Sequence, residues 1–126
     1  VQLKYYGFGG KQVRDYLHID DLYSLIEKQS KNITSHFGSY YNVGGGINNT
    51  TSIVELSSKI DSMMSKKTKK ILHDKPRTAD QKIYISDIDK VSRAFDWQPV
   101  ITLNDGLKTV FDWINDDTED FGWFNV

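Results

Sequence analysis

Short apolar runs with the two-residue period of strands alternate along this chain with longer runs that keep helical spacing, and this alternation most constrains its fold. The run Ser52–Glu55 matches a capping box, and the apolar residues that follow it recur at helical intervals. Further helices are expected to begin at Asp20, Asp87 and Thr102, where a polar residue precedes an apolar stripe. The sequence therefore predicts a mixed α/β fold with about four helices and short strands.

The strand-like runs cover residues 1–5, 12–19, 39–43, 70–73 and 83–85. The first two runs flank a glycine-rich segment at residues 7–10, so we expect them to pair as a β-hairpin. Because side chains alternate along a strand, Arg14, Tyr16 and His18 are expected to share one face of the second run.

The length and composition suit one domain with its own core. The chain has 126 residues, of which 38% are hydrophobic, 13% aromatic and 26% charged, and these fractions exclude a disordered tail or a fibrous protein. Surface scaling predicts a folded area of ~6,900 Å², roughly a third of the area of the unfolded chain. We therefore expect residues 1–126 to form one compact unit.

Charge, cysteine count and hydropathy exclude several classes of protein. The net charge is −1, so no broad basic field favours nucleic acid. The absence of cysteine excludes a disulfide scaffold and a thiol nucleophile. No apolar run approaches the roughly 18 residues that a membrane span needs, and no signal peptide is recognisable, although a cleaved one would leave no trace. We expect a cytoplasmic protein with no membrane partner.

The residue types alone provide no complete catalytic set. The chain has no Tyr-x-x-x-Lys pair and no Gly-x-Gly-x-x-Gly that opens a helix. Gly44–Gly46 lies six residues before the Ser52 cap, so a tight turn is favoured over a phosphate cradle. His18, Asp20 and Asp21 lie at a strand-to-helix junction that scatters their side chains. We therefore expect neither catalytic residues, nor a cofactor site, nor a metal site in this chain.

Arginine is rare in this chain and is placed next to aspartate. Thirteen of the 16 basic residues are lysines, and two of the arginines occur as Arg14-Asp15 and as Arg77 three residues before Asp80. A guanidinium group can clamp a diphosphate through paired hydrogen bonds, and a carboxylate can accept a ribose hydroxyl. On residue types alone, a structural salt-bridge role for both arginines stays equally open.

Two blocks of the sequence resemble a known family in the same order along the chain. Gly10–Leu22 (GKQVRDYLHIDDL) resembles the G-x-Q-x-R-D-[aromatic]-[aliphatic]-H-V-x-D-L stretch of the extended short-chain dehydrogenase/reductase family, the NAD-dependent nucleotide-sugar epimerases and dehydratases. Tyr41–Gly46 (YNVGGG) is similar to the Y-N-[aliphatic]-G-x-G turn of that family, and Ser52–Leu56 then opens a helix as it does there.

A third block extends the resemblance over about residues 1–115. Arg77–Asp80 and the segment that follows it are similar to the family pattern R-x-G-D…D-x-S-K…L-G-W-x-P. Ala79 and Asp96 stand where the family usually has glycine, which puts the backbone geometry at Ala79 in question. The glycine-rich NAD fingerprint and the Tyr-x-x-x-Lys pair of the family have no counterpart here.

The resemblance implies that residues 1–126 are the C-terminal, nucleotide-sugar-binding domain of a longer enzyme with a Rossmann-type parent fold, roughly its last third. NAD would be bound mainly by an N-terminal domain that this chain lacks, and none is expected on the chain itself. In the family, NAD takes a hydride from the sugar to give a transient ketone. Return of the hydride to the other face, or proton exchange next to the ketone, then inverts a stereocentre. The implied partner is a nucleotide-diphosphate sugar, and a homo-oligomer is expected.

The resemblance also assigns substrate-binding residues position by position. Arg14 and Arg77 would grip the diphosphate, and Asp80 would accept a ribose hydroxyl. Tyr84 matches a position that faces the sugar or the phosphate, and Tyr6 would lie near the base.

Neighbouring residues are expected to be structural. Asp15 and His18 would orient Arg14 and satisfy the adjacent turn, Trp97 would pack in the core, and Arg93 would be a surface charge. Two other functions stay open: a nucleotide-sugar 4,6-dehydratase of the same family, and a non-enzymatic nucleotide-binding or interaction module.

Overall fold

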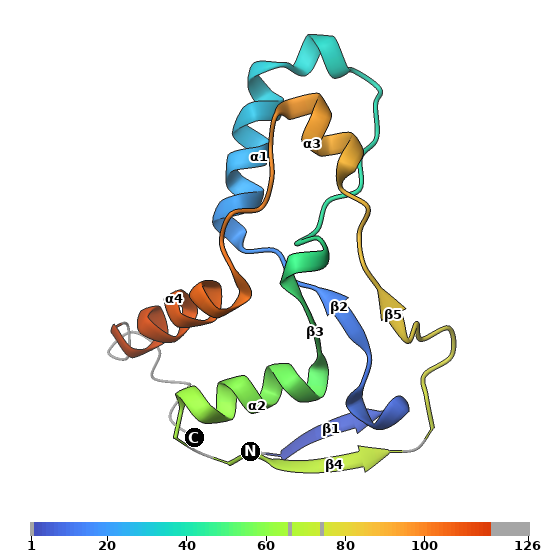
Figure 1. Cartoon of the computed structure of the whole chain (residues 1–126), viewed down its shortest axis with the longest axis vertical. Helices are drawn as coiled ribbons and strands as arrows, with labels where there is room; N and C mark the ends of the chain where they lie inside the picture. Colours follow the sequence, from blue (N-terminus) through green and yellow to red (C-terminus); the bar gives the residue numbers. More distant parts are fainter. Residues whose placement is uncertain (1, 66, 74, 117–126) are drawn as a thin grey trace.

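A computed structural model describes residues 2–65, 67–73 and 75–116 of the chain, and Figure 1 shows its arrangement. Within these residues, the four α-helices are α1 (Ile19–Lys31), α2 (Ile53–Met63), α3 (Asp89–Phe95) and α4 (Leu103–Asp116). The strands are β1 (Gln2–Tyr6), β2 (Val13–Asp15), β3 (Thr50–Ser52), β4 (Lys69–His73) and β5 (Ile83–Tyr84). The predicted mixed α/β fold with four helices and short strands is confirmed.

The strands form two small sheets. In the first, β1 pairs with β4 in parallel, with Tyr6 opposite His73. In the second, β2 is central: it runs antiparallel to β3 and parallel to β5, so that Arg14 lies opposite Thr51 on one side and Tyr84 on the other.

The predicted hairpin between residues 1–5 and 12–19 is therefore wrong. Phe8–Gly10 forms a single 3₁₀ turn that carries the chain from the first sheet to the second. The N–H group of Gly7 donates to the carbonyl oxygen of His73 at 2.7 Å, which continues the pairing of β1 with β4 instead. Gly7 has φ 66°, and a β-carbon there would meet Pro76 at 2.4 Å, so this turn requires glycine.

The N-cap of α1 shortens the second predicted strand. His18 is the N-cap of α1, and its Nδ1 atom accepts the N–H of Asp20 at 3.2 Å, so the second strand ends at Asp15. The predicted strand at residues 39–43 is absent, because this segment pairs with none of the described strands.

The capping box predicted at the start of α2 is confirmed. The Ser52 hydroxyl accepts the N–H of Glu55 at 3.2 Å, and the Glu55 carboxylate accepts the N–H of Ser52 at 2.9 Å.

The principal core lies between α1 and α3. It consists of four buried side chains, with Tyr41, Val43 and other partly buried residues packed against them: Leu25, Val91, Phe95 and Trp97. The expected core role of Trp97 is confirmed, because its side chain is only 3% exposed.

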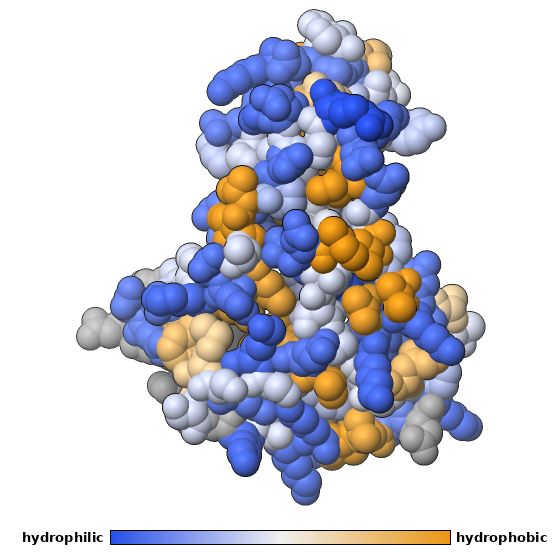
Figure 2. Space-filling view, in the orientation of Figure 1, coloured by the Kyte–Doolittle hydropathy of each residue, from blue (hydrophilic) through white to orange (hydrophobic). Residues whose placement is uncertain are grey.

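Much apolar surface stays exposed. The accessible surface is 9464 Å², larger than the ~6,900 Å² that scaling gives for a compact monomer of this mass. Figure 1 shows why: α1 and α3 form one end of an elongated molecule, and the β1–β4 sheet with α2 forms the other. In Figure 2, apolar residues are visible as separate surface patches between polar ones. No helix in the described ranges is long and apolar enough to span a membrane.

Candidate functional site

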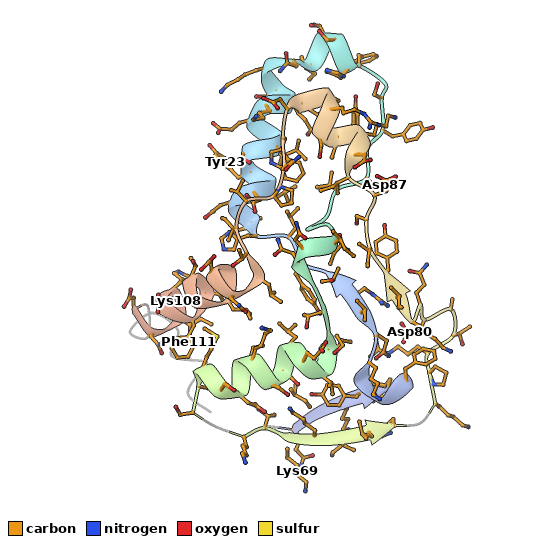
Figure 3. The ribbon with its side chains drawn as sticks, viewed as in Figure 1. Tyr23, Lys69, Asp80, Asp87, Lys108 and Phe111 are labelled. Carbon is orange, nitrogen blue, oxygen red and sulfur yellow. The ribbon has the colours of Figure 1, made fainter. Side chains whose placement is uncertain are left out.

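A cavity of 240 Å³ lies between the end of β1, the start of β2 and the chain that follows β4. Four of the five residues predicted to bind substrate contribute to its wall, and they come from three separate parts of the sequence: Tyr6, Arg14, Arg77 and Asp80. Figure 3 labels Asp80 beside β5. The wall also includes Lys4, so three positive charges face one carboxylate, a balance that favours an anionic ligand.

Arg14 and Asp80 form an ion pair across this cavity. The Nη2 atom of Arg14 lies 3.2 Å from Oδ1 of Asp80 and also donates to the carbonyl oxygen of Gln81 at 2.9 Å. Nη1 of Arg14 donates to the carbonyl oxygen of Val13 at 2.7 Å. The two side chains are 31% and 18% exposed, so the guanidinium is held in place and is still reachable by a ligand.

Gln12 contributes to the same cavity and was missed by the sequence analysis. Its side-chain nitrogen donates both to the carbonyl oxygen of Tyr6, at 2.6 Å, and to Oδ2 of Asp80, at 2.9 Å. The residue is 4% exposed. The sequence offered one indication of its role: Gln12 is the glutamine of the G-x-Q-x-R-D pattern and lies two residues before Arg14.

Aromatic and cationic groups gather on the ring of Tyr6. The His73 ring stacks on it with a centroid separation of 4.8 Å and an interplanar angle of 8°. The guanidinium carbon of Arg77 lies 5.0 Å from the Tyr6 ring centroid, within the range of a cation–π contact. His73 matched no family motif, and only the pairing of β1 with β4 brings it here.

Tyr84 lies beside the cavity and not in its wall. It is on β5, directly opposite Arg14 in the sheet, and its side chain is 45% exposed. Tyr16, two residues beyond Arg14, is partly buried; this burial raises the pKa of its phenol, and the positive charge of Arg14 offsets part of the rise.

Ala79 and Asp96, which stand where the family usually has glycine, keep the backbone conformation that glycine favours. Ala79 has φ 62° and Asp96 has φ 45°, both in the left-handed region that glycine favours. The Ala79 substitution therefore leaves the turn between Arg77 and Asp80 closed, with the N–H of Asp80 donating to the carbonyl oxygen of Arg77 at 3.1 Å.

Asp15 is structural, as expected, but it does not orient Arg14. Its Oδ2 atom accepts the N–H groups of Gly46 and Ser86, each at 3.2 Å, and so joins the glycine turn to the chain after β5. Arg14 is oriented by Asp80 instead, and His18 caps α1.

The glycine turn packs closely against the chain on both sides of β2. A β-carbon on Gly44 would lie 2.1 Å from Asp15, and one on Gly45 would lie 1.9 Å from the carbonyl oxygen of Tyr16. Gly44 and Gly45 are therefore required for the close packing of this tight turn.

A larger cavity of 670 Å³ lies between this turn and α3, and it contains none of the predicted substrate-binding residues. Arg93 borders it with a 78% exposed side chain, 3.9 Å from Asp89, which agrees with its expected role as a surface charge. Within the described ranges, no three metal-ligating side chains gather in one place.

A family model described as GDP-mannose 4,6 dehydratase matches residues 2–110. The chain belongs to this family. The expected resemblance to NAD-dependent nucleotide-sugar epimerases and dehydratases is confirmed.

Individual members of this family show similar sequences and folds. CDP-paratose 2-epimerase of Salmonella typhi is 34% identical over 104 residues, which are 82% of this chain and 30% of that protein. The dTDP-glucose 4,6-dehydratase of Shigella flexneri is 28% identical over 113 residues, 82% of this chain and 30% of its own length. The chain thus spans about a third of the length of these relatives.

Among solved structures, UDP-glucuronic acid 4-epimerase from Bacillus cereus, in complex with UDP-glucuronic acid and NAD, superimposes with a TM-score of 0.78. It is 27% identical, and the match covers 91% of this chain and 35% of that one. The similarity of fold therefore extends over almost the whole chain.

Proposed function

We propose that this chain is the nucleotide-sugar-binding domain of a longer NAD-dependent nucleotide-sugar epimerase, and that its 240 Å³ cavity holds the nucleoside diphosphate. The observation that carries the proposal is the convergence of Tyr6, Arg14, Arg77 and Asp80 on one cavity, although they are far apart in the sequence. Binding energy from the nucleotide then orients the sugar for a reaction elsewhere in the enzyme.

Each residue has a role that suits its chemistry. Arg14 and Arg77 bind the diphosphate, since a guanidinium fork matches paired phosphate oxygens. Asp80 accepts a ribose hydroxyl, and the Tyr6 ring lies against the base. Tyr84, next to Arg14 on β5, faces the sugar or the phosphate.

NAD is assigned to the part of the longer protein that this chain does not span. When bound there, it supplies hydride transfer. The proposal is supported by NAD in the complex of the Bacillus cereus epimerase, of which the match to this chain covers 35%. A homo-oligomer is part of the proposal, and a cytoplasmic location stays a prediction.

Within the family, the reaction we favour is that of CDP-paratose 2-epimerase, because that relative has 34% identity. A nucleotide-sugar 4,6-dehydratase is the second candidate, favoured by the dTDP-glucose dehydratase at 28% identity and by the description of the family model. Incubation of the full-length protein with CDP-, UDP- and dTDP-linked sugars separates the two: an epimerase returns an isomer, and a dehydratase returns a product that has lost water.

Titration calorimetry of the full-length protein with cytidine diphosphate tests the binding site. Arg14→Ala and Arg77→Ala are each expected to weaken binding by about 1.5–3 kcal/mol, the range for hydrogen bonds to charged groups. Arg93→Ala is the matched control and is expected to change binding little, because Arg93 is exposed outside the cavity. Equal small effects at all three positions would show that the motif is misassigned.

The titration and the incubation with nucleotide sugars together separate an enzyme from a binding module. A full-length protein that binds the diphosphate but turns over no nucleotide sugar would favour the non-enzymatic module. A start codon immediately before residue 1 in the reading frame would also favour it, because no room would remain for an NAD domain.

A further inference from the structure

The amide of Gln12 connects two parts of the cavity wall. Its side-chain nitrogen has two protons, one donated to the Tyr6 carbonyl oxygen at 2.6 Å and the other to Oδ2 of Asp80 at 2.9 Å. Tyr6 is the last residue of β1, and Asp80 follows β4 by several residues. One buried side chain thus sets the separation of these two elements.

The other end of the same amide has no partner. Oε1 of Gln12 is buried without a hydrogen bond among the described residues. The amide cannot be turned around without harm, because its oxygen would then face the Tyr6 carbonyl and the Asp80 carboxylate. Native proteins seldom leave a buried polar atom unpaired, so an unpaired amide oxygen needs a reason, and a role of the side chain besides packing is one such reason.

Two donors fix the Asp80 carboxylate. Arg14 holds Oδ1 at 3.2 Å and Gln12 holds Oδ2 at 2.9 Å, so each oxygen has its own partner. A carboxylate held by one donor keeps a wider range of orientations, since the terminal torsion of aspartate is broad. Held at both oxygens, it meets a ligand hydroxyl in one orientation, and the ligand does not bear the cost of ordering it.

We propose that Gln12 is a positioning residue that sets the Asp80 carboxylate for a ribose hydroxyl, and so gives the site its selectivity for ribonucleoside diphosphates with free sugar hydroxyls. The inference rests on the proposed function, because it takes the ligand to be a nucleoside diphosphate. It assigns Gln12 no contact with the ligand; the residue acts through Asp80.

The test compares the affinities of the full-length protein for cytidine diphosphate and for 2′,3′-dideoxycytidine diphosphate. The wild type is expected to prefer the first by about tenfold or more, the lower end for a hydrogen bond to a charged group. Gln12→Met keeps an unbranched side chain but removes both donors and the orphaned acceptor. This variant is expected to lose most of the preference while its affinity for the dideoxy nucleotide stays near that of the wild type.

A double variant identifies the route of the effect. If Gln12 acts through Asp80, Gln12→Met is expected to add no further loss of preference in an Asp80→Asn background, because coupled residues are not additive. Gln12→Glu is the second variant, since it keeps the shape of the side chain and places a carboxylate against Asp80; it too is expected to lose the preference. Denaturation midpoints identify which variants fold.

Each outcome decides between the two proposals. No binding of cytidine, uridine or thymidine diphosphate by the wild type overturns the proposed function. Binding without a preference for the ribose hydroxyls, or a preference that survives in a folded Gln12 variant, overturns the positioning role alone. An equal loss for both nucleotides means that Gln12 is only structural.

Discussion

The indole N–H of Trp97 donates to the backbone carbonyl oxygen of Asp21 at 3.0 Å, in the first turn of α1. The Asp21 carboxylate in turn accepts the N–H groups of Val100 and Ile101, at 3.1 Å and 3.0 Å. Asp21 is 2% exposed, so one buried residue fastens α1 to the chain between α3 and α4. The carboxylate thus accepts the two backbone N–H groups of Val100 and Ile101, which lie outside the helices and strands and have no partner from secondary structure.

Asp21→Ala is expected to destabilise the protein by about 3 kcal/mol, because two hydrogen bonds to a charged group are lost and their donors are left without partners. Chemical denaturation of the full-length protein measures this loss. Asp20→Ala is the matched control: Asp20 is the preceding residue, its side chain is 71% exposed, and the substitution is expected to change stability little. Equal effects at both positions would show that the buried carboxylate has no special part in stability.

The capping box of α2 is expected to make stability depend on pH. The hydrogen bond from the Ser52 hydroxyl is the main cause that lowers the pKa of Glu55 below its ordinary value of 4.5, and the bond from the Ser52 N–H adds to it. A group whose pKa falls on folding stabilises the protein fully above its unfolded pKa, and this contribution disappears as the pH falls through the folded pKa.

Denaturation of the wild type and of Glu55→Gln between pH 7 and pH 3 tests this dependence. The wild type is expected to be the more stable at pH 7. The difference is expected to shrink as the pH falls below about 4.5, the ordinary pKa, and to vanish once Glu55 is protonated in the folded protein as well and resembles glutamine. In a Ser52→Ala background the main cause of the lowered pKa is gone, so the pH dependence of the Glu55→Gln effect is expected to be weaker. A constant difference across the pH range would contradict the assignment.

Features that depend on near neighbours in the sequence could be predicted. The capping box at Ser52 and the presence of four helices follow from polar residues and apolar spacing within a few residues. The expected starts at Asp20 and Asp87 are wrong by one or two residues, because the N-caps of α1 and α3 are His18 and Ile88. The pairing of β1 could not be predicted, because its partner β4 begins at Lys69 and nothing in the alternation of either strand specifies the other. A hairpin is the more common arrangement of successive strands, and here the chain crosses to a second sheet instead.

Part of the candidate site could also be predicted from the sequence, and part could not. The family motifs identified Arg14, Arg77 and Asp80, and the fold gathers them. Gln12 and His73 were missed because their parts depend on tertiary contacts: a buried amide that spans two loops, and a ring stacked across a strand pair.

Purified residues 1–126 are expected to show no epimerase activity with any nucleotide sugar, with or without added NAD. The reason is chemical: the chain has no Tyr-x-x-x-Lys pair to act as a general base. Product analysis after long incubation measures this, with the full-length protein as the positive control. Turnover above the buffer blank would overturn the proposal that the chemistry belongs to another part of the enzyme.

The surface of the chain favours self-association when residues 1–126 are isolated. One face of α1 presents Ile19, Tyr23 and Ile26, which are 68%, 61% and 52% exposed and recur at helical spacing; Tyr23 is labelled in Figure 3. Within the described residues β1 pairs with β4 alone, so the other edge of β1 has unpaired backbone groups. Exposed apolar faces and open strand edges both favour contacts between molecules.

We therefore expect light scattering at micromolar concentration to detect dimers or larger species of residues 1–126. Ile26→Lys places a charge on the apolar face, and it is expected to shift the distribution towards monomer if that face is the contact. Gln81→Lys adds the same charge at an exposed polar position and is expected to have no effect. Association that survives Ile26→Lys would point to pairing at the edge of β1, because that edge depends on backbone groups alone. A wild-type chain that stays monomeric would show that neither the apolar face of α1 nor the edge of β1 drives association.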